Sequence, residues 1–158
     1  GSMSPTLIEG DLLICNRLAY ISDEPQRGDI IAFDSGGTVY VKRVVGIAGD
    51  NIEVKYGTVK INGIELDESE YLPEGTLTRT GSSFEYTVPE NCVFVMGDWR
   101  WASYDSRFWE EPYISLDNIL GKGIFSIPTH KIREYFGVVP EYYQYLEQEE
   151  ELQQMLEQ

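Results

Sequence analysis

Short apolar runs, rich in β-branched and aromatic residues, recur along the first hundred residues, and turn residues bound each of them. A hairpin is predicted at Asn62-Gly63, which lies between the runs "TVKI" and "IEL". Strands are predicted at residues 12–15, 30–33, 39–45, 51–54, 58–61, 84–88 and 93–96. Many short, closely spaced strands are typical of an antiparallel sheet system. The expected fold class is therefore mainly β, an antiparallel sheet system that is either coiled or barrel-like.

Two other stretches break this pattern. Residues 67–83 are polar and contain two glycines, so they are expected to form a long loop. Residues 140–158 carry apolar residues at helical spacing after Pro140, which suits a first helical turn. This stretch has six Glu, no Lys and no Arg. The pattern predicts a body over residues 1–139 and an acidic amphipathic helix over 140–158, which docks on the body or self-associates with a second copy.

Composition narrows the classes of function. A chain of 158 residues suits one domain, and a net charge of −15 argues against nucleic acid as a partner. Cys15 and Cys92 lie in apolar runs and fit no metal-ligand spacing, so buried free thiols are expected. Neither a signal peptide nor an apolar run of about 18 residues is present. Neither a metal cluster nor a phosphate loop nor a nucleotide fingerprint is found, so no cofactor or metal is expected.

Any histidine-dependent chemistry would have to use His130. It stands in "IPTHKIRE", beyond the last clear strand, where an exposed histidine in a connecting segment is the favoured interpretation. A serine nucleophile without histidine needs another base, and lysine is the physical alternative. Such a lysine must be neutral at the working pH, and burial among apolar groups favours its neutral form.

Lys42 meets that requirement within "TVYVKRVVGIAGD". In a strand, Lys42 shares one face with Tyr40 and Val44, whereas Arg43 lies on the opposite face with Val41 and Val45. One of the two cations is therefore expected to point into the more enclosed side. Taken alone, the stretch still favours a surface lysine whose stem covers apolar residues.

A third stretch, "VFVMGDWRWASYDSRFWEEP", leaves an apolar strand and becomes a polar loop. Its charges predict ion pairs that hold the loop rigid, Asp98 with Arg100 or Asp105 with Arg107. Ser103 is placed to hydrogen-bond near a catalytic group. Composition alone is equally consistent with a polar turn carrying incidental ion pairs.

Together these stretches resemble the bacterial type I signal peptidase family. The resemblance rests on "SMSPTL", "RGDIIAF", "YVKRVVGIAGD" and "FVMGDWRWASYDSR" in that order, with "GTVKINGIEL", "VPENCVFVMGD" and "ILGKGIFSI" between and after them. It spans residues 2 to 127. It implies a serine endopeptidase with a Ser-Lys dyad, which removes signal peptides from exported preproteins at the extracytoplasmic face of the bacterial cell membrane.

Position by position, the resemblance implies Ser2 as the nucleophile and Lys42 as the general base. Ser103 corresponds to the serine that hydrogen-bonds and orients the lysine. The supporting residues implied are Asp105, Arg107, Asp98 and Arg100. The Ser2 N–H corresponds to one donor to the oxyanion.

Family substrates carry small residues before the cut, which implies shallow apolar pockets and a substrate that pairs as an added strand. The residues implied to line those pockets are Met3, Leu7, Thr38, Tyr40 and Val41. The family's membrane anchor and second oxyanion donor are expected upstream of Gly1. The length is similar to the compact Gram-positive enzymes.

One departure from the family pattern is Trp99, where asparagine is usual. With Trp101 and Trp109 it belongs to an aromatic group that either packs around the loop or rests on the membrane interface. Two alternatives to a general signal peptidase stay open. One is a self-cleaving repressor-type protease, and the other is a catalytically idle assembly factor for pilus or surface-protein biogenesis. A peptidase dedicated to pilin or other surface-protein precursors combines the family activity with the second.

Overall fold

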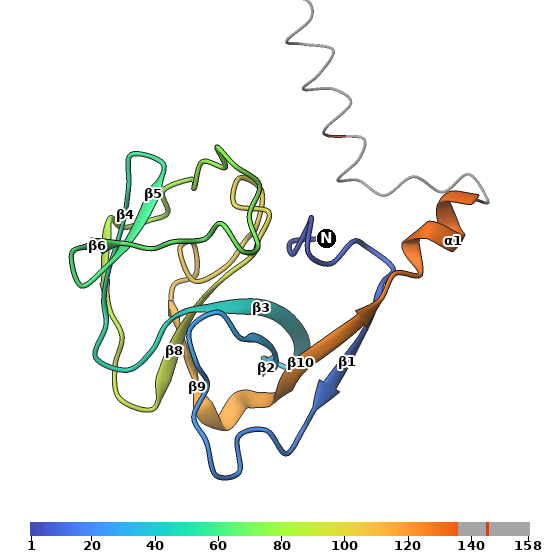
Figure 1. Cartoon of the computed structure of the whole chain (residues 1–158). Coiled ribbons are helices and arrows are strands. Elements are labelled where there is room, and N and C mark those ends of the chain that lie inside the picture. The colour runs from blue at the N-terminus through green and yellow to red at the C-terminus, as the bar shows by residue number, and fades with distance from the viewer. Residues whose placement is uncertain (136–144, 146–158) are drawn as a thin grey trace, which may run out of the picture.

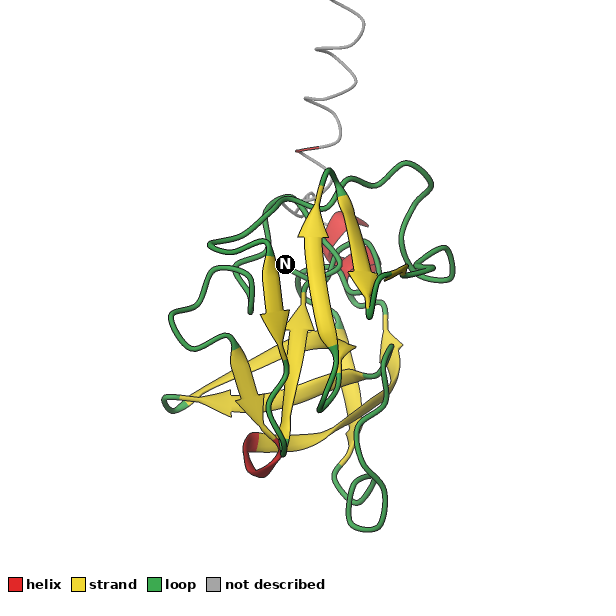
Figure 2. Ribbon diagram, turned by 90° about the vertical axis from the view of Figure 1, so that its left-hand side faces the viewer, coloured by secondary structure: helices red, strands yellow, loops and turns green. Residues whose placement is uncertain are grey.

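The computed structural model describes residues 1–135 and residue 145, so the helix expected over 140–158 lies, apart from Tyr145, outside the described residues. The regular structure of the body is mainly strand, with long loops between the strands (Figure 2). They are β1 (Leu12–Asn16), β2 (Ile30–Ser35), β3 (Thr38–Gly46), β4 (Asn51–Lys55), β5 (Thr58–Ile61), β6 (Ile64–Glu65), β7 (Glu85–Thr87), β8 (Cys92–Met96), β9 (Tyr113–Ser115) and β10 (Ile119–Ile127). A 3-10 turn, η1 (Leu116–Asn118), precedes β10, and a short helix, α1 (His130–Tyr135), follows it.

The strands form two antiparallel sheets. The larger has the order β1-β10-β2-β3-β8-β9, and the smaller has the order β6-β5-β4-β7. In Figure 1 the smaller sheet and α1 lie at opposite ends of the body. All seven predicted strands are present, with bounds shifted by a residue or two. β9 and β10 were not among the predicted strands, and β6 was predicted only as the second arm of the Asn62-Gly63 hairpin.

The expectation of a barrel-like closure is wrong for the described residues. β1 and β9 are the two edges of the larger sheet, and no ladder among the described strands joins them. The smaller sheet also stays open, between β6 and β7. The long polar loop predicted over residues 67–83 is confirmed, with a single isolated bridge between Gly57 and Thr78.

Turn residues set the hairpins where the sequence predicted them. Asn62 and Gly63 both have positive φ, 52° and 83°, the combination that a two-residue hairpin turn needs. They join β5 to β6, and Asn62 Oδ1 accepts a hydrogen bond from the Asn51 N–H at 2.9 Å. Tyr56 and Gly57 make the same kind of turn between β4 and β5.

The centre of the larger sheet is buried on both faces. Alternate residues of β3 and β8 point to opposite sides, so Val45 and Met96 join one apolar cluster while Val44 and Val95 join the other. The first cluster fills the space between the two sheets. Cys15 and Cys92 are free thiols as predicted, but they are half-buried. From Lys42 onward, side chains on either face of β3 are therefore buried.

Asp50 ties three separate turns together. Its carboxylate accepts hydrogen bonds from Arg27 Nη2 at 2.6 Å, from the Ile47 N–H at 2.9 Å and from Asn62 Nδ2 at 2.9 Å. Burial raises the pKa of Asp50, but these hydrogen bonds outweigh it and hold the pKa below its ordinary value. The connection between the two sheets thus depends on an ionised carboxylate.

We expect Asp50→Asn to lower the free energy of unfolding by about 1–3 kcal/mol at neutral pH, because it leaves buried donors poorly matched. The folded pKa of Asp50 lies below its unfolded value. The wild type's advantage is therefore present above the unfolded pKa and lost as the pH falls through the folded pKa. Urea unfolding from pH 7 downward measures this, with the exposed Asp117→Asn as control. A gap that stays constant into acid would contradict the assignment.

Candidate active site

β3 carries two adjacent cations, and both are buried. Lys42 is 3% exposed and Arg43 is 6% exposed, on opposite faces of the strand. Only one of the two was expected from the sequence to be enclosed. Both are enclosed because each face of β3 is covered by its own apolar cluster at this point. Their partners differ, and that difference shapes the site.

Arg43 is fully paired. Its Nε and Nη2 donate to the two carboxylate oxygens of Asp98 at 2.8 and 2.6 Å, and its Nη1 donates to the Gly28 carbonyl at 2.8 Å. The guanidinium also lies 3.9 Å from the ring centroid of Tyr71. A bidentate pair of this kind fixes both side chains. Arg43 therefore serves as a structural cation that holds Asp98.

Lys42 has no such partner. Its Nζ donates a hydrogen bond to Ser2 Oγ, and among the described residues no carboxylate oxygen lies within ion-pair distance of it. Burial lowers the pKa of Lys42. Asp105 and Asp98 oppose this shift electrostatically, whereas the Arg107 charge adds to it. The site therefore contains, beside a serine hydroxyl, a lysine that loses its proton more readily than a free lysine.

The segment that carries Ser2 has no regular secondary structure and is held by the turn after β8. The Trp99 N–H donates to the Ser2 carbonyl at 3.0 Å, and Thr6 Oγ1 donates to Asp98 Oδ2 at 2.5 Å. Met3 and Ile8 are buried and anchor the same segment. Accordingly, the N-terminus lies over β3 (Figure 1).

Gly97 allows this close approach. Its N–H donates to Asp105 Oδ2 at 2.9 Å. A Cβ at this position would overlap both the Ser103 hydroxyl and the Ser2 carbonyl oxygen. Only glycine therefore lets the turn, the serine-bearing segment and Ser103 pack at one point.

The predicted pair of Asp105 and Arg107 is present. Arg107 Nε and Nη2 donate to the two Asp105 oxygens at 2.8 and 2.7 Å, and both residues are completely buried. Arg107 Nη1 also donates to the carbonyls of Arg79 and Arg100 at 2.7 and 2.8 Å. This pair holds the loop from inside and places the Asp105 oxygen that receives the Gly97 N–H.

The other predicted pair is wrong. Asp98 pairs with Arg43, and Arg100 turns to the loop over residues 67–83, where its guanidinium pairs with both Glu68 oxygens. Thr78 Oγ1 accepts a further hydrogen bond from Arg100 at 3.0 Å. Sequence reasoning missed Glu68, because a pairing across 32 positions leaves no local signal. For Arg43, no partner was predicted from the sequence.

Ser103 is buried next to the site, yet its hydroxyl makes no hydrogen bond with a described residue. The expected hydrogen bond from Ser103 to Lys42 is thus not formed in this structure. The packing against Gly97 accounts for its place: Ser103 Oγ lies against the Gly97 Cα on the side that a Cβ would occupy. A buried hydroxyl with unused bonding capacity adjoins the serine-bearing segment.

His130 is not the exposed histidine that was expected. It is 6% exposed, at the start of α1, and its Nδ1 lies 2.5 Å from Asp11 Oδ1. Burial raises the pKa of Asp11, but hydrogen bonds from His130 and the Ile8 N–H lower it overall. His130 makes no hydrogen bond with Ser2, so a Ser-His-Asp triad is not built around that serine.

The residues expected to contact substrate lie along β3 and the N-terminal segment. Thr38 and Tyr40 are exposed, Val41 and Leu7 are half-buried, and Met3 is buried. The ladder between β3 and β8 begins only at Arg43, so no described strand pairs with that edge of β3 from residue 38 to residue 41. An open strand edge thus leads directly to Lys42.

The three tryptophans of the loop have different surroundings. Trp109 is half-buried and packs its ring against Phe33 and Tyr40 at centroid distances of 6.1 and 6.3 Å. Trp101 is 56% exposed. The Trp99 ring meets the Tyr145 ring edge to face at 5.4 Å, while its backbone holds Ser2. The aromatic side chain at position 99 thus leaves the backbone contact intact.

The chain is similar in sequence to known proteins. A family model described as "Signal peptidase, peptidase S26" matches residues 1–127. Signal peptidase I of Bacillus caldolyticus is 39% identical over 132 residues, 77% of this chain and 71% of that protein. Signal peptidase I of Leptolyngbya laminosa is 35% identical over 152 residues, 89% of this chain and 71% of that protein.

A solved structure also matches. The crystal structure of a signal peptidase I from Enterococcus faecalis V583 superposes with a TM-score of 0.53 at 32% sequence identity. The match covers 65% of this chain and 98% of the Enterococcus faecalis chain. In the part of the chain that the structure describes, no helix is long and apolar enough to cross a membrane.

We expect Gly97→Ala to lower peptide cleavage at least about 100-fold, because a displacement of roughly 1 Å at a reacting group costs that much. The added methyl would push Ser2 and Ser103 apart. Steady-state kinetics with an Ala-x-Ala peptide measure the loss. Gly123→Ala is the matched control, since its methyl would meet only the side chains of Leu13 and Ile30. Equal activity of the two variants would contradict the packing argument.

We expect Lys42→Met to raise the free energy of unfolding by about 1 kcal/mol or more at neutral pH, because it removes a poorly compensated buried charge. The folded pKa of Lys42 lies below its unfolded value, so the unfolded chain binds more protons between the two. Wild-type stability therefore rises as the pH increases through that interval, and the gap to the variant narrows. Urea unfolding between pH 6 and about 10.4 tests this. The exposed Lys131→Met should show no such trend.

Proposed function

Because the chain belongs to the signal peptidase S26 family, we propose that it is a serine endopeptidase that removes signal peptides from exported preproteins, with Ser2 as nucleophile and Lys42 as general base. The observation that carries the proposal is the hydrogen bond between Lys42 Nζ and Ser2 Oγ in a buried setting without an ion-pair partner. A lysine must lose its proton to act as a base, and this environment favours that loss.

The reaction begins with neutral Lys42. Its Nζ accepts the proton of the Ser2 hydroxyl while Ser2 Oγ attacks the carbonyl carbon of the scissile bond. The leaving amine takes a proton from Lys42 as the acyl-enzyme ester forms. Lys42 Nζ then takes a proton from a water molecule, which attacks the ester carbonyl, and the proton passes from Lys42 to Ser2 Oγ as the ester bond breaks. Each step moves a proton only between neighbouring groups.

The developing oxyanion needs hydrogen-bond donors near Ser2. Among the described residues, no acceptor takes the Ser2 N–H. The Trp99 N–H fixes the Ser2 carbonyl, which orients the peptide unit on the other side of the same residue. We assign the Ser2 N–H as one oxyanion donor on this basis.

Ser103 fits a positioning role. It lies beside Ser2 and Gly97 with an unused hydroxyl, so it has the capacity to bond with the lysine when Lys42 loses its proton. Asp105 with Arg107, and Asp98 with Arg43, hold the turn that places these groups. Arg100 supports the loop through Glu68.

The preprotein would bind as an added strand along the open edge of β3. Thr38, Tyr40 and Val41 precede Lys42 on that edge and would contact the residues next to the cut. Leu7 and Met3 belong to the segment that carries Ser2 and would form a second wall for the bound strand. The family resemblance implies activity at the extracytoplasmic face of the membrane, and we propose the same for this chain, with Trp101 as an exposed aromatic contact to the interface.

The test is cleavage of a preprotein peptide with an Ala-x-Ala site, in lipid or detergent, with mass spectrometry to locate the cut. We expect cutting after the second Ala, and a loss of at least about 1,000-fold in both Ser2→Ala and Lys42→Met. Activity should rise with pH through a value below the ordinary lysine pKa of about 10.4. Ser126→Ala and Lys131→Met are matched controls that should stay active.

Two results would contradict the proposal. Cleavage that survives in Ser2→Ala would remove Ser2 as the nucleophile. Silence of the wild type, under conditions in which the Bacillus caldolyticus enzyme cuts the same peptide, would favour the catalytically idle assembly factor. The same assay tests a role dedicated to pilin or other surface-protein precursors, by comparing the rates at which precursor peptides of each kind are cut.

A further inference from the structure

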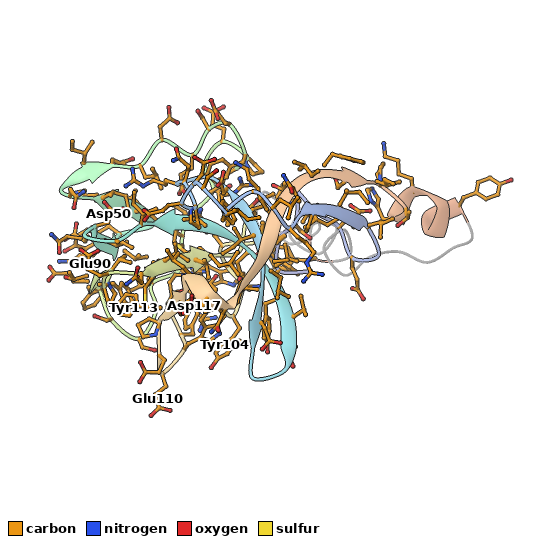
Figure 3. The ribbon with its side chains drawn as sticks, turned by 90° about the horizontal axis from the view of Figure 1, so that it is seen from below. Asp50, Glu90, Tyr104, Glu110, Tyr113 and Asp117 are labelled. Carbon is orange, nitrogen blue, oxygen red and sulfur yellow. The ribbon has the colours of Figure 1, made fainter. Side chains whose placement is uncertain are left out.

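A cavity of about 510 Å³ is lined in part by Tyr40 of β3, two residues before Lys42, and aromatic and acidic side chains form much of its walls. Tyr40, Tyr104 and Trp109 supply rings, while Glu110 and Glu111 supply carboxylates. Figure 3 labels Tyr104 and Glu110, which lie on the same side of the body, away from α1. Neither lysine nor arginine nor histidine is among the described residues that line the cavity.

The rings form a continuous wall. The centroid of Trp109 lies 6.3 Å from that of Tyr40 and 6.4 Å from that of Tyr104, with interplanar angles of 57° and 70°. Phe33, which is fully buried, stacks on Tyr40 at 5.9 Å and fixes this wall to the core. The wall is thus preformed, and rings set at large angles to one another offer both faces and edges to a bound group.

The acidic side of the cavity is open to solvent. Glu110 and Glu111 are exposed, and neither forms an ion pair with another described residue. Electron-rich ring faces and free carboxylates both attract cations, and a net charge of −15 adds a general attraction. Charge complementarity therefore selects a positively charged occupant.

Two residues that line the cavity are close in the chain to residues of the proposed active site. Tyr40 lies two residues before Lys42 on the same face of β3, a step of roughly 7 Å along a strand. Tyr104 directly follows Ser103, which packs against Gly97 beside Ser2. A substrate strand on the open edge of β3 would place one of its side chains near the Tyr40 ring.

We propose that this cavity is a subsite for a lysine or arginine side chain of the preprotein, within about two residues of the cleaved bond. The proposal rests on the proposed function, since it deepens the substrate specificity of the same site. The aliphatic stem would lie on the Tyr40 and Trp109 rings, and the charged end would reach Glu110 or Glu111. Tyr104 closes the cavity as a specificity-determining residue.

The experiment compares peptides that share the Ala-x-Ala site and carry Lys, Gln or Glu at one position at a time, on either side of the cut. In the wild type we expect kcat/KM for Lys to exceed that for Gln by about tenfold at one position, with Glu lowest. Raising the salt to about 1 M should shrink this ratio. A ratio of one at every position overturns the subsite.

Glu110→Gln with Glu111→Gln should bring the Lys:Gln ratio close to one while the Gln peptide is cut as before. Glu85→Gln with Glu90→Gln is the matched control, because it removes the same charge from exposed glutamates that do not line the cavity. Tyr104→Leu should lower the ratio as well. A ratio that persists in the Glu110 and Glu111 double variant contradicts the proposal.

Binding separates this proposal from the proposed function. Tryptophan fluorescence measures the dissociation constants of the same peptides for the Ser2→Ala protein. This measurement does not depend on whether the wild type cleaves them. Tighter binding of the Lys peptide, lost in the Glu110 and Glu111 double variant, supports the subsite even if the wild type cuts nothing. Equal dissociation constants overturn it even if cleavage depends on Ser2 and Lys42.

Discussion

The turn that follows β8 is the constraint on which the rest of the site depends. It holds an N-terminal segment without regular secondary structure by two hydrogen bonds. The Trp99 N–H donates to the Ser2 carbonyl, and the Thr6 hydroxyl donates to the Asp98 carboxylate. The turn is itself fixed from within, because Gly97 donates to Asp105, and Asp105 is locked by Arg107. Backbone order elsewhere is provided by sheet pairing, but Ser2 owes its position to this turn.

The two buried cations of β3 show how one strand serves two purposes. A guanidinium stays charged at any working pH, so Arg43 is suited to a permanent bidentate pair with Asp98. An ammonium changes its pKa readily when buried, and Lys42 lies where burial lowers it beside a serine hydroxyl. The paired cation stabilises the scaffold, and the unpaired one supplies the proposed base.

Substrate recognition follows from where β3 loses a neighbour. β8 pairs with β3 only from Arg43 onward, because the chain leaves β8 at Gly97 to build the turn. The same feature that positions Ser2 therefore opens the strand edge at residues 38–41. Tyr40 belongs both to this open edge and to the lining of the cavity, so it links the proposed cation subsite to the proposed site of cleavage.

The sequence by itself determined most of the strands, the hairpin turns and the order of the motifs. Period-two alternation and local turn chemistry act over a few residues, so β3, the Asn62-Gly63 hairpin and the Asp105–Arg107 pair were all predictable. The order of the motifs further indicated the family and, with it, the pairing of Ser2 with Lys42.

Only the tertiary structure decided which distant groups meet. Arg43 rather than Arg100 takes Asp98, Glu68 takes Arg100, and His130 is buried against Asp11. Each of these contacts joins residues far apart in the chain. The local sequence around each acidic residue gives no reason to prefer one basic partner over another. The open sheets and the aromatic cavity likewise arise from packing between segments, which no short window of sequence contains.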